Sequence, residues 1–486
     1  MATDNLKQKA VSGMLWTAIQ KYSTMGVNFI SGIILARLLM PEDYGAIGML
    51  AIFMSSAEVF IDAGFGSALI QKKKPTQTDY STVFYFNIGM SVILYATLYL
   101  CAPAIAGFYR MPILCDILRV QGLILFIYAF NIIQRNQIRK KLLFKKLSKI
   151  TIITSVISLI VTVVMAYMEF GVWSLVAQNL IGALIPCLYF WITTNWHPTW
   201  EYSWKSFREL FGFGSYMFLT HLFGTFSERI TGLLVGRWYN PATMGYYSKA
   251  STTTKTATLS ISGVMIQTTY PLYASVQEDK VRLSNMVKRI TSTLAYITIP
   301  MLSLLILVAK PLFVFLFSDR WLESVPYFQI LCFGGMASCL LSVNQQTIAA
   351  IGKSRVFFVW SIIKQSVAIV LQIVGLIVWG LWGLLFGKVL SSWFSYLVNI
   401  SLVSKYVGYK NFQQLKDLSP IFMVSVIALA VSSYLTGLML LNLYLDGVVK
   451  ALFFVVIYLG WSIMFKPEAY IYTLSIWQVL KLKHNK

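Results

Sequence analysis

One apolar hairpin motif occurs twice in this chain at positions 200 residues apart, ILARLLMPEDYG from Ile34 to Gly45 and LVGRWYNPATMG from Leu234 to Gly245. In each copy an arginine lies near the end of an apolar stretch, and a proline begins the next stretch. A second match pairs residues 171–175 (GVWSL) with residues 380–384 (GLWGL). Internal repeats of this kind predict a chain built from two related lobes.

Apolar segments long enough to cross a membrane recur along the whole sequence. The chain is 57% hydrophobic and only 12% charged, whereas about a quarter of the residues of a soluble domain are charged. A bilayer core of about 30 Å requires roughly 20 mostly apolar residues per helix. Runs of that length lie near 14–39, 44–70, 82–108, 113–134, 150–169, 171–194, 210–236, 243–272, 288–317, 325–350, 356–379, 381–404, 420–443 and 447–465. We therefore predict an all-α polytopic membrane protein with about 14 transmembrane helices, arranged as two repeated six-helix lobes plus two C-terminal helices.

These segments define four predicted regions. An N-terminal six-helix lobe covers residues 1–195, a cytoplasmic inter-lobe linker 196–209, a C-terminal six-helix lobe 210–405, and two additional helices with a cytoplasmic tail 406–486. The linker is rich in aromatic residues, which favour the headgroup boundary of a membrane: Trp196, Trp200, Tyr202 and Trp204.

Basic residues set the predicted orientation. Of the 40 Lys and Arg, 27 fall in the loops on one side of the predicted spans and only Arg110, Lys310, Arg320 and Lys450 fall in the opposite loops. The positive-inside rule then places both termini of this multi-pass membrane protein in the cytoplasm. The net charge of +22 is thus explained by membrane topology, and we expect no nucleic-acid partner.

The sequence gives no reason to expect catalysis, a metal or a cofactor. The five cysteines lie in apolar runs without metal-ligand spacing, and no Walker-type Gly-Lys loop is present. A membrane-embedded enzyme would require a sizeable loop or domain with acidic ligands. We find neither, and expect a protein that is not an enzyme.

Function is expected where polar residues interrupt the membrane spans, because a charge in hydrocarbon costs several kcal/mol unless it faces a cavity or a partner. The candidate substrate-binding residues of such a cavity are Lys21, Asn28, Arg229, Lys249, Lys255, Lys364 and Lys388. The candidates for ion coupling are the acidic residues Glu58, Asp62 and Glu228. On the second span Ser55, Glu58, Asp62 and Gly66 share one helix face.

Other polar residues have a simpler structural interpretation. Arg37 and Arg237 lie near helix ends, where arginine can cap carbonyl groups. Asp43 stands in the first turn of a helix begun by Pro41, a typical capping position. His221 is either a proton site or a packing residue.

Three N-terminal segments carry a resemblance to a known family: SGMLWTAIQKYS from Ser12, LARLLMPEDYGAIGMLAIF from Leu35 and FIDAGFGSALIQKK from Phe60. They resemble the Wzx-type polysaccharide and O-antigen flippases, the lipopolysaccharide biosynthesis and colanic-acid exporter proteins of the multidrug/oligosaccharidyl-lipid/polysaccharide exporter superfamily. The resemblance implies two six-helix lobes around a cationic cavity. It also implies a substrate made of sugar repeat units on undecaprenyl diphosphate, carried to the outer leaflet of the bacterial inner membrane.

An anionic substrate suits the interior charges, because basic side chains can replace the water around a phosphate. Rocking of the two lobes would move the substrate by alternating access. Coupling to H⁺ or Na⁺, or the membrane potential, would drive the movement. Polysaccharide polymerase machinery is an expected partner. A cation-coupled drug or small-molecule antiporter of the same superfamily is one alternative, and it is expected to have a more acidic cavity. The alternative from a different class is a membrane polysaccharide polymerase or glycosyltransferase.

Overall fold

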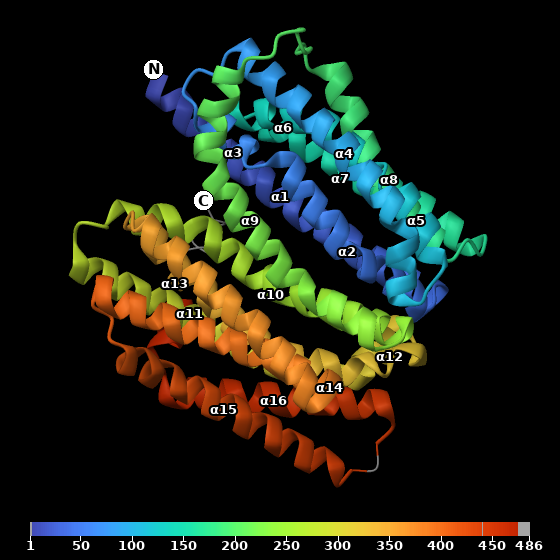
Figure 1. Cartoon of the computed structure of the whole chain (residues 1–486). Coiled ribbons are helices and arrows are strands. Elements are labelled where there is room, and N and C mark those ends of the chain that lie inside the picture. Colours follow the sequence, from blue (N-terminus) through green and yellow to red (C-terminus); the bar gives the residue numbers. More distant parts are fainter. Residues whose placement is uncertain (1, 440, 475–486) are drawn as a thin grey trace. The chain divides into compact units, whose positions relative to one another are not determined.

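The computed structural model describes residues 2–439 and 441–474, and the regular elements of these residues are helices (Figure 1). Side chains at residues 2–11, 14, 213, 261, 264–268, 270, 271, 274, 354 and 355 lie outside this description, as does the end of the predicted tail, 475–486. The chain forms two compact units, Met1–Ser248 and Lys249–Lys486.

The first unit contains most of the predicted N-terminal lobe and the helix that begins the second repeat. α2 and α3 are two segments of one predicted span, separated by Ala63 and Gly64 in the left-handed region of the backbone. The helices of this unit are α1 (Ala2–Leu38), α2 (Pro41–Asp62), α3 (Phe65–Gln71), α4 (Gln77–Tyr109), α5 (Ile113–Gln121), α6 (Ile124–Lys140), α7 (Phe144–Tyr167), α8 (Val172–Thr193), α9 (Trp204–Trp238) and the first residues of α10 (Pro241–Ser275).

The two copies of the repeated motif pack against each other within this unit. A Cβ atom on Gly45 would collide with the carbonyl oxygen of Pro241, and a Cβ atom on Gly245 would collide with the carbonyl oxygen of Pro41. Each glycine thus meets the proline of the other copy, which is the reciprocal pattern of a two-fold contact. α9 also packs along α2. This packing explains why the compact units do not divide at the predicted lobe boundary, which remains a prediction from the repeat.

The linker between α8 and α9 is an extended strap fastened to the start of α4. The indole nitrogen of Trp196 donates a 2.7 Å hydrogen bond to the side chain of Gln77, and the amide of Thr199 donates a 3.0 Å bond to Ser81 Oγ. Trp196 is only 9% exposed, whereas Trp200 is 95% exposed. The ring and the N–H group of Trp196 thus find partners inside the bundle. The position of the linker aromatics at the headgroup boundary remains a prediction.

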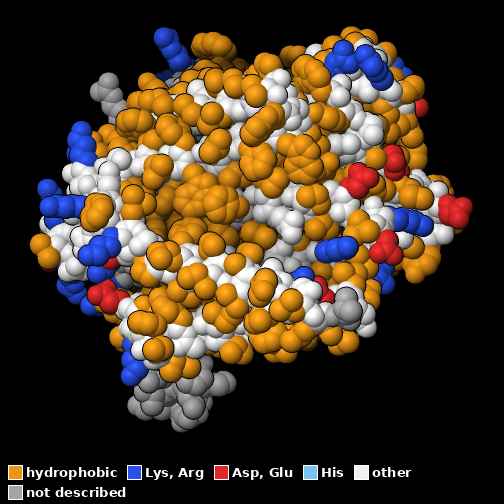
Figure 2. All heavy atoms as spheres, turned by 90° about the horizontal axis from the view of Figure 1, so that it is seen from below, with side chains coloured by type: hydrophobic (Ala, Val, Ile, Leu, Met, Phe, Trp, Pro, Cys, Tyr) orange, Lys and Arg blue, Asp and Glu red, His pale blue; other side chains and the backbone are white. Residues whose placement is uncertain are grey.

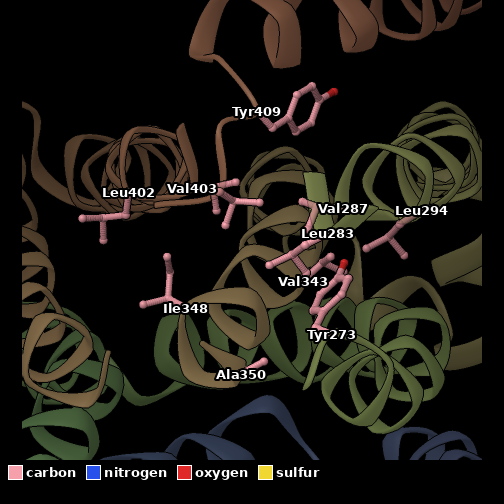
Figure 3. Packing of buried hydrophobic residues seen from close by; sticks show 11 residues of the cluster. Tyr273, Leu283, Val287, Leu294, Val343, Ile348, Ala350, Leu402, Val403 and Tyr409 are labelled. Carbon is pink, nitrogen blue, oxygen red and sulfur yellow. The ribbon is translucent and has the colours of Figure 1, made fainter. Parts of the chain in front are cut away.

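The second unit continues α10 and adds the C-terminal helices. Its core joins four helices through the fully buried side chains of Tyr273, Val287, Val343 and Val403, which converge in Figure 3. The elements after α10 are α11 (Lys280–Leu307), α12 (Ala309–Phe317), the 3₁₀ helix η1 (Asp319–Trp321), α13 (Ser324–Ala350), α14 (Ser354–Val407), α15 (Asn411–Gly437) and α16 (Leu443–Phe465).

α14 is a hairpin of two antiparallel helical arms. The chain turns at Gly380, whose φ of 61° and ψ of −139° interrupt the helix in a region that essentially only glycine adopts. Next to the turn the backbones touch, because Cβ atoms on Gly375 and Gly383 would collide with each other's carbonyl oxygens. Gly387 lies equally close to the carbonyl oxygen of Leu371. The two arms are the eleventh and twelfth predicted spans.

The described helices account for the predicted spans. Ten segments are long and apolar enough to cross a membrane, one of which, residues 356–407, covers both arms of α14. The long helices α1, α9 and α10, which carry polar stripes in the sequence, are not among these ten. With them and with both arms counted separately, the fourteen predicted spans are reproduced. The prediction of an all-α polytopic membrane protein is confirmed.

The outer surface suits lipid contact. Large apolar side chains point outward from several helices, and Leu100, Ile192 and Met464 are 77%, 83% and 79% exposed. Figure 2 shows hydrophobic side chains spread over the face in view. Monomeric soluble proteins rarely expose so much contiguous apolar surface.

Candidate substrate cavity

The first unit contains a cavity of about 550 Å³ lined by residues of α2, α5, α6, α7, α8 and α9. α2 contributes Ser55 and Glu58 to its wall, α6 contributes Tyr128 and Arg135, and α9 contributes Arg229. The α2 pair is spaced i, i+3 and the α6 pair i, i+7, so each pair lies on one helix face. The cavity is therefore polar and charged along helices that are otherwise apolar.

A second cavity of about 270 Å³ adjoins the first. Its charged lining includes Asp62 at the end of α2, Arg139 on α6 and His221 on α9. Three residues of α6 line both cavities: Tyr128, Asn131 and Arg135. These shared residues make the two cavities one continuous polar region along α6.

Three arginines dominate the charge of this region. Arg135, Arg139 and Arg229 all line the cavities and are all exposed there. Within the described part of the chain none of their guanidinium groups forms a salt bridge. The planar guanidinium group offers paired N–H donors that match a phosphate. The arginines are therefore free to bind an anionic group that enters the cavity.

The two cavity carboxylates differ in their partners. Asp62 Oδ1 accepts a 3.1 Å hydrogen bond from the amide of Gly66, which holds the break between α2 and α3. Glu58, one turn earlier on α2, forms no hydrogen bond or salt bridge among the described residues. Asp62 thus has a structural role in this geometry, and Glu58 is the better candidate for ion coupling. The described residues contain no group of three or more possible metal ligands.

The structure brings together half of the predicted site residues of this unit. The residues that line the cavities are Glu58, Asp62 and Arg229. The residues that line neither cavity are Lys21, Asn28 and Glu228. Lys21 is half-buried on α1, while Asn28 and Glu228 are exposed. Their expected contacts with a substrate remain predictions.

The predicted lysines of the second unit have varied surroundings. Lys249 is 5% exposed, and its Nζ lies 3.9 Å from the ring centroid of Phe317 and 5.3 Å from that of Trp321. This cation–π contact accounts for its burial without a bound ligand. Lys364 is likewise buried, in the first arm of α14, whereas Lys388 in the second arm is half-buried and Lys255 on α10 is exposed. Substrate contacts of these four lysines remain predictions.

The arginines of α6 were not among the predicted site residues. The fourth predicted span ended at residue 134, which left Arg135 and Arg139 among the basic loop residues, but α6 continues to Lys140. The spacing of Tyr128, Asn131, Arg135 and Arg139 as i, i+3, i+7 and i+11 could have revealed them, because it places all four on one helix face.

The structural interpretation of the repeated motif is confirmed at two positions. The carboxylate of Asp43 accepts a 2.9 Å hydrogen bond from the amide of Met40 at the start of α2. Nη1 of Arg237 donates a 3.1 Å bond to the carbonyl oxygen of Phe108 at the end of α4. Both side chains therefore satisfy helix termini.

A bundle of membrane-spanning helices with a charged internal cavity is the arrangement expected of a membrane transporter. The fold is similar to that of the lipid II flippase MurJ in an inward closed conformation, with a TM-score of 0.75 over 93% of this chain and 98% of that chain, at 17% identity. It is also similar to an inward-facing MATE multidrug transporter of the MOP superfamily, with a TM-score of 0.64 over 82% of this chain and 98% of that one, at 15% identity.

The chain belongs to the polysaccharide biosynthesis protein family, which matches residues 34–326. One relative is the teichuronic acid biosynthesis protein TuaB of Bacillus subtilis, 24% identical over 73% of this chain and 74% of the relative. Another is the lipopolysaccharide biosynthesis protein WzxC of Escherichia coli, 21% identical over 90% of this chain and 89% of the relative. The succinoglycan biosynthesis transport protein ExoT of Rhizobium meliloti is 21% identical over 72% of this chain and 71% of the relative. The family resemblance inferred from the N-terminal segments is confirmed.

Proposed function

We propose that this protein moves lipid-linked oligosaccharide units from the cytoplasmic to the outer leaflet of the bacterial inner membrane. Family membership supports the proposal, as do relatives named for lipopolysaccharide biosynthesis and for succinoglycan transport. The observation that carries it is the group of arginines without salt bridges, Arg135, Arg139 and Arg229, around two adjoining cavities.

The charge of the cavity suits a diphosphate carrier such as undecaprenyl diphosphate. Moving a phosphate into hydrocarbon strips its water at a cost of many kcal/mol, and charge-assisted hydrogen bonds are the strongest replacement that side chains offer. Arg135 lines both cavities and so lies where a diphosphate would pass from one to the other. The prenyl tail would stay in the lipid while the sugars cross beside the polar face of α6.

Alternating access is the proposed mode of movement. In the orientation favoured by the basic loops, both termini are cytoplasmic, and the contact of Gly45 and Gly245 with the opposite prolines lies at the outer end of the first unit. Separation of the two repeated hairpins would open that end. Rocking of related repeats is the usual route for transporters built in this way.

Coupling to H⁺ or Na⁺ is proposed for Glu58, the cavity carboxylate that forms no hydrogen bond or salt bridge among the described residues. The membrane potential can also act on the charged carrier. The delivered units would then pass to polysaccharide polymerase machinery at the outer face.

The proposal is tested by deleting the gene in its host and measuring the lipid-linked oligosaccharide in each leaflet. We expect the glycolipid to accumulate in the cytoplasmic leaflet and to be restored to the outer leaflet by the wild-type gene. Loss of the glycolipid from both leaflets would indicate a biosynthetic enzyme instead. An unchanged leaflet distribution with increased sensitivity to cationic drugs would indicate an antiporter.

A further inference from the structure

The α14 hairpin holds two lysines opposite each other at its open end. The close approaches put residue 375 opposite 383 and residue 371 opposite 387. Because both antiparallel arms rise by the same distance per residue, this register also pairs residue 360 with 398 and 356 with 402. One turn further along, it pairs Lys353 with Lys405.

A groove of about 460 Å³ lies between the arms near this end. Its walls are mainly apolar, and Leu402, at the edge of the core cluster in Figure 3, forms part of its floor. The groove lies beyond the glycine contacts, toward the open end of the hairpin. The apolar residues that line it are Val356, Val359, Trp360, Val398 and Leu402.

Cationic groups gather at the mouth of this groove. Lys353 Nζ lies 5.9 Å and Lys405 Nζ 5.7 Å from the ring centroid of Tyr406, and Lys405 and Tyr406 line the groove. Both lysines are exposed, and neither forms a salt bridge with any residue that the structure describes. Two ammonium groups around one aromatic ring, above an apolar channel, match a phosphate headgroup with an acyl chain below it.

We propose that this groove binds one anionic phospholipid of the surrounding bilayer, with its phosphate between Lys353 and Lys405 and an acyl chain along Trp360 and Val398. In the orientation favoured by the basic loops, the lysines lie at the cytoplasmic leaflet. The volume is within the roughly 300–1,000 Å³ of small-molecule sites.

The lining of the groove selects a phospholipid over the lipid-linked oligosaccharide. Among the described residues that line the groove, the polar side-chain groups besides Lys405 and Tyr406 are the hydroxyl of Ser401 and the indole N–H of Trp360. This set is sufficient for one phosphate, but it offers few hydrogen-bonding groups for a chain of sugars. The site therefore differs in kind from the arginine-lined cavities of the first unit.

A lipid bound in the groove would contact both arms of α14 and stabilise their packing. Val356, Trp360, Val398 and Tyr406 also pack against the core cluster around Tyr273. Lipid in the groove covers the outer side of these residues and keeps the arms in register. Occupancy is therefore expected to raise the thermal stability of the whole protein, because a ligand that binds only the folded state stabilises it.

The test is lipid retention by the purified full-length protein, measured by native mass spectrometry and by thermal unfolding in nanodiscs. The nanodiscs are prepared with phosphatidylglycerol, phosphatidylcholine or undecaprenyl phosphate. The variant is Lys353→Gln with Lys405→Gln, and the matched control is Lys410→Gln with Lys416→Gln, whose side chains are exposed outside the groove. We expect phosphatidylglycerol binding to fall about 30-fold in the variant and not in the control, since each lysine near a lipid surface contributes about a factor of five.

A second variant separates the groove from simple surface charge. Val359→Trp fills the channel without removing a charge, and it should abolish both the retained lipid and the thermal stabilisation by phosphatidylglycerol. Equal loss of binding in the Lys410/Lys416 control would overturn the proposal, since it would show non-specific attraction. Preferential retention of undecaprenyl phosphate over phosphatidylglycerol would also overturn it, and would assign the groove to the transported lipid.

Discussion

Substitution of Gly245 by alanine tests the reciprocal contact between the repeated hairpins. The added Cβ atom would overlap the carbonyl group of Pro41 and lie 3.0 Å from its Cα atom. These are backbone atoms that cannot rotate away, so the helices must separate. Overpacking of this kind typically costs about 1–3 kcal/mol, and we expect the upper part of that range.

A matched control has the opposite sign. Gly89 lies inside α4, and a Cβ atom there would meet nothing within 4 Å. Gly89→Ala should therefore stabilise the protein by about 0.5–1 kcal/mol, because alanine loses less conformational freedom in a helix than glycine does.

The double variant Gly45→Ala with Gly245→Ala sharpens the test. Each glycine contacts the proline of the other copy, so both contacts lie in the same interface. The methyl group of the first alanine already separates the two hairpins, which leaves room for the methyl group of the second. The combined cost should be clearly smaller than the sum of the single costs. The free energy of unfolding is measured by titrating mixed micelles with a denaturing detergent. The reciprocal contact would be refuted if the two single losses of unfolding free energy added up in the double variant. It would also be refuted if Gly245→Ala and Gly89→Ala changed the free energy of unfolding in the same direction.

Three further predictions follow from the first unit. A Cβ atom on Gly48 would lie 2.6 Å from Ser248 Oγ. Cysteines at both positions should therefore form a disulfide that stops flipping until a reductant is added. Full activity of the disulfide-linked protein would exclude opening of the outer end at this contact. Glu58→Gln should make flipping in vesicles insensitive to imposed H⁺ or Na⁺ gradients, and retained gradient dependence would place coupling elsewhere. Trp196→Ala should destabilise the protein by about 3–5 kcal/mol in thermal unfolding, whereas the exposed Trp200→Ala should change stability by less than about 0.5 kcal/mol; equal effects would contradict the buried position of the strap.

The positions of the helices were predicted well from the sequence, because hydrophobic segments and internal repeats can be recognised from local sequence patterns. Each predicted apolar run corresponds to one helix, to two consecutive helices or to one arm of α14, and the motif at Ile34 and its copy at Leu234 form a structural pair. The break at Gly380 was also foreseen, as the boundary between the eleventh and twelfth spans. Hydrophobic periodicity and helix length suffice for these features.

The site was predicted less completely, because facing directions depend on packing. A polar stripe shows which residues share a helix face but not what that face meets. Glu58 and Asp62 share a stripe and both line cavities, yet a hydrogen bond to a backbone amide occupies only Asp62. Lys249 has the same appearance in sequence as a cavity lysine, but aromatic rings 60 to 80 residues away surround it. Such contacts arise from tertiary structure alone.

The central claim is that the arginines of the first unit carry a lipid-borne phosphate across the membrane. The most direct measurement is the flipping of a fluorescent lipid-linked oligosaccharide diphosphate in proteoliposomes by the variant Arg135→Gln with Arg229→Gln. Its control is Arg208→Gln, an exposed arginine of α9 outside both cavities. Since a hydrogen bond to a charged group contributes about 1.5–3 kcal/mol, the cavity variant should flip at least about tenfold more slowly while the control keeps the wild-type rate. Wild-type flipping by a folded cavity variant would contradict the account.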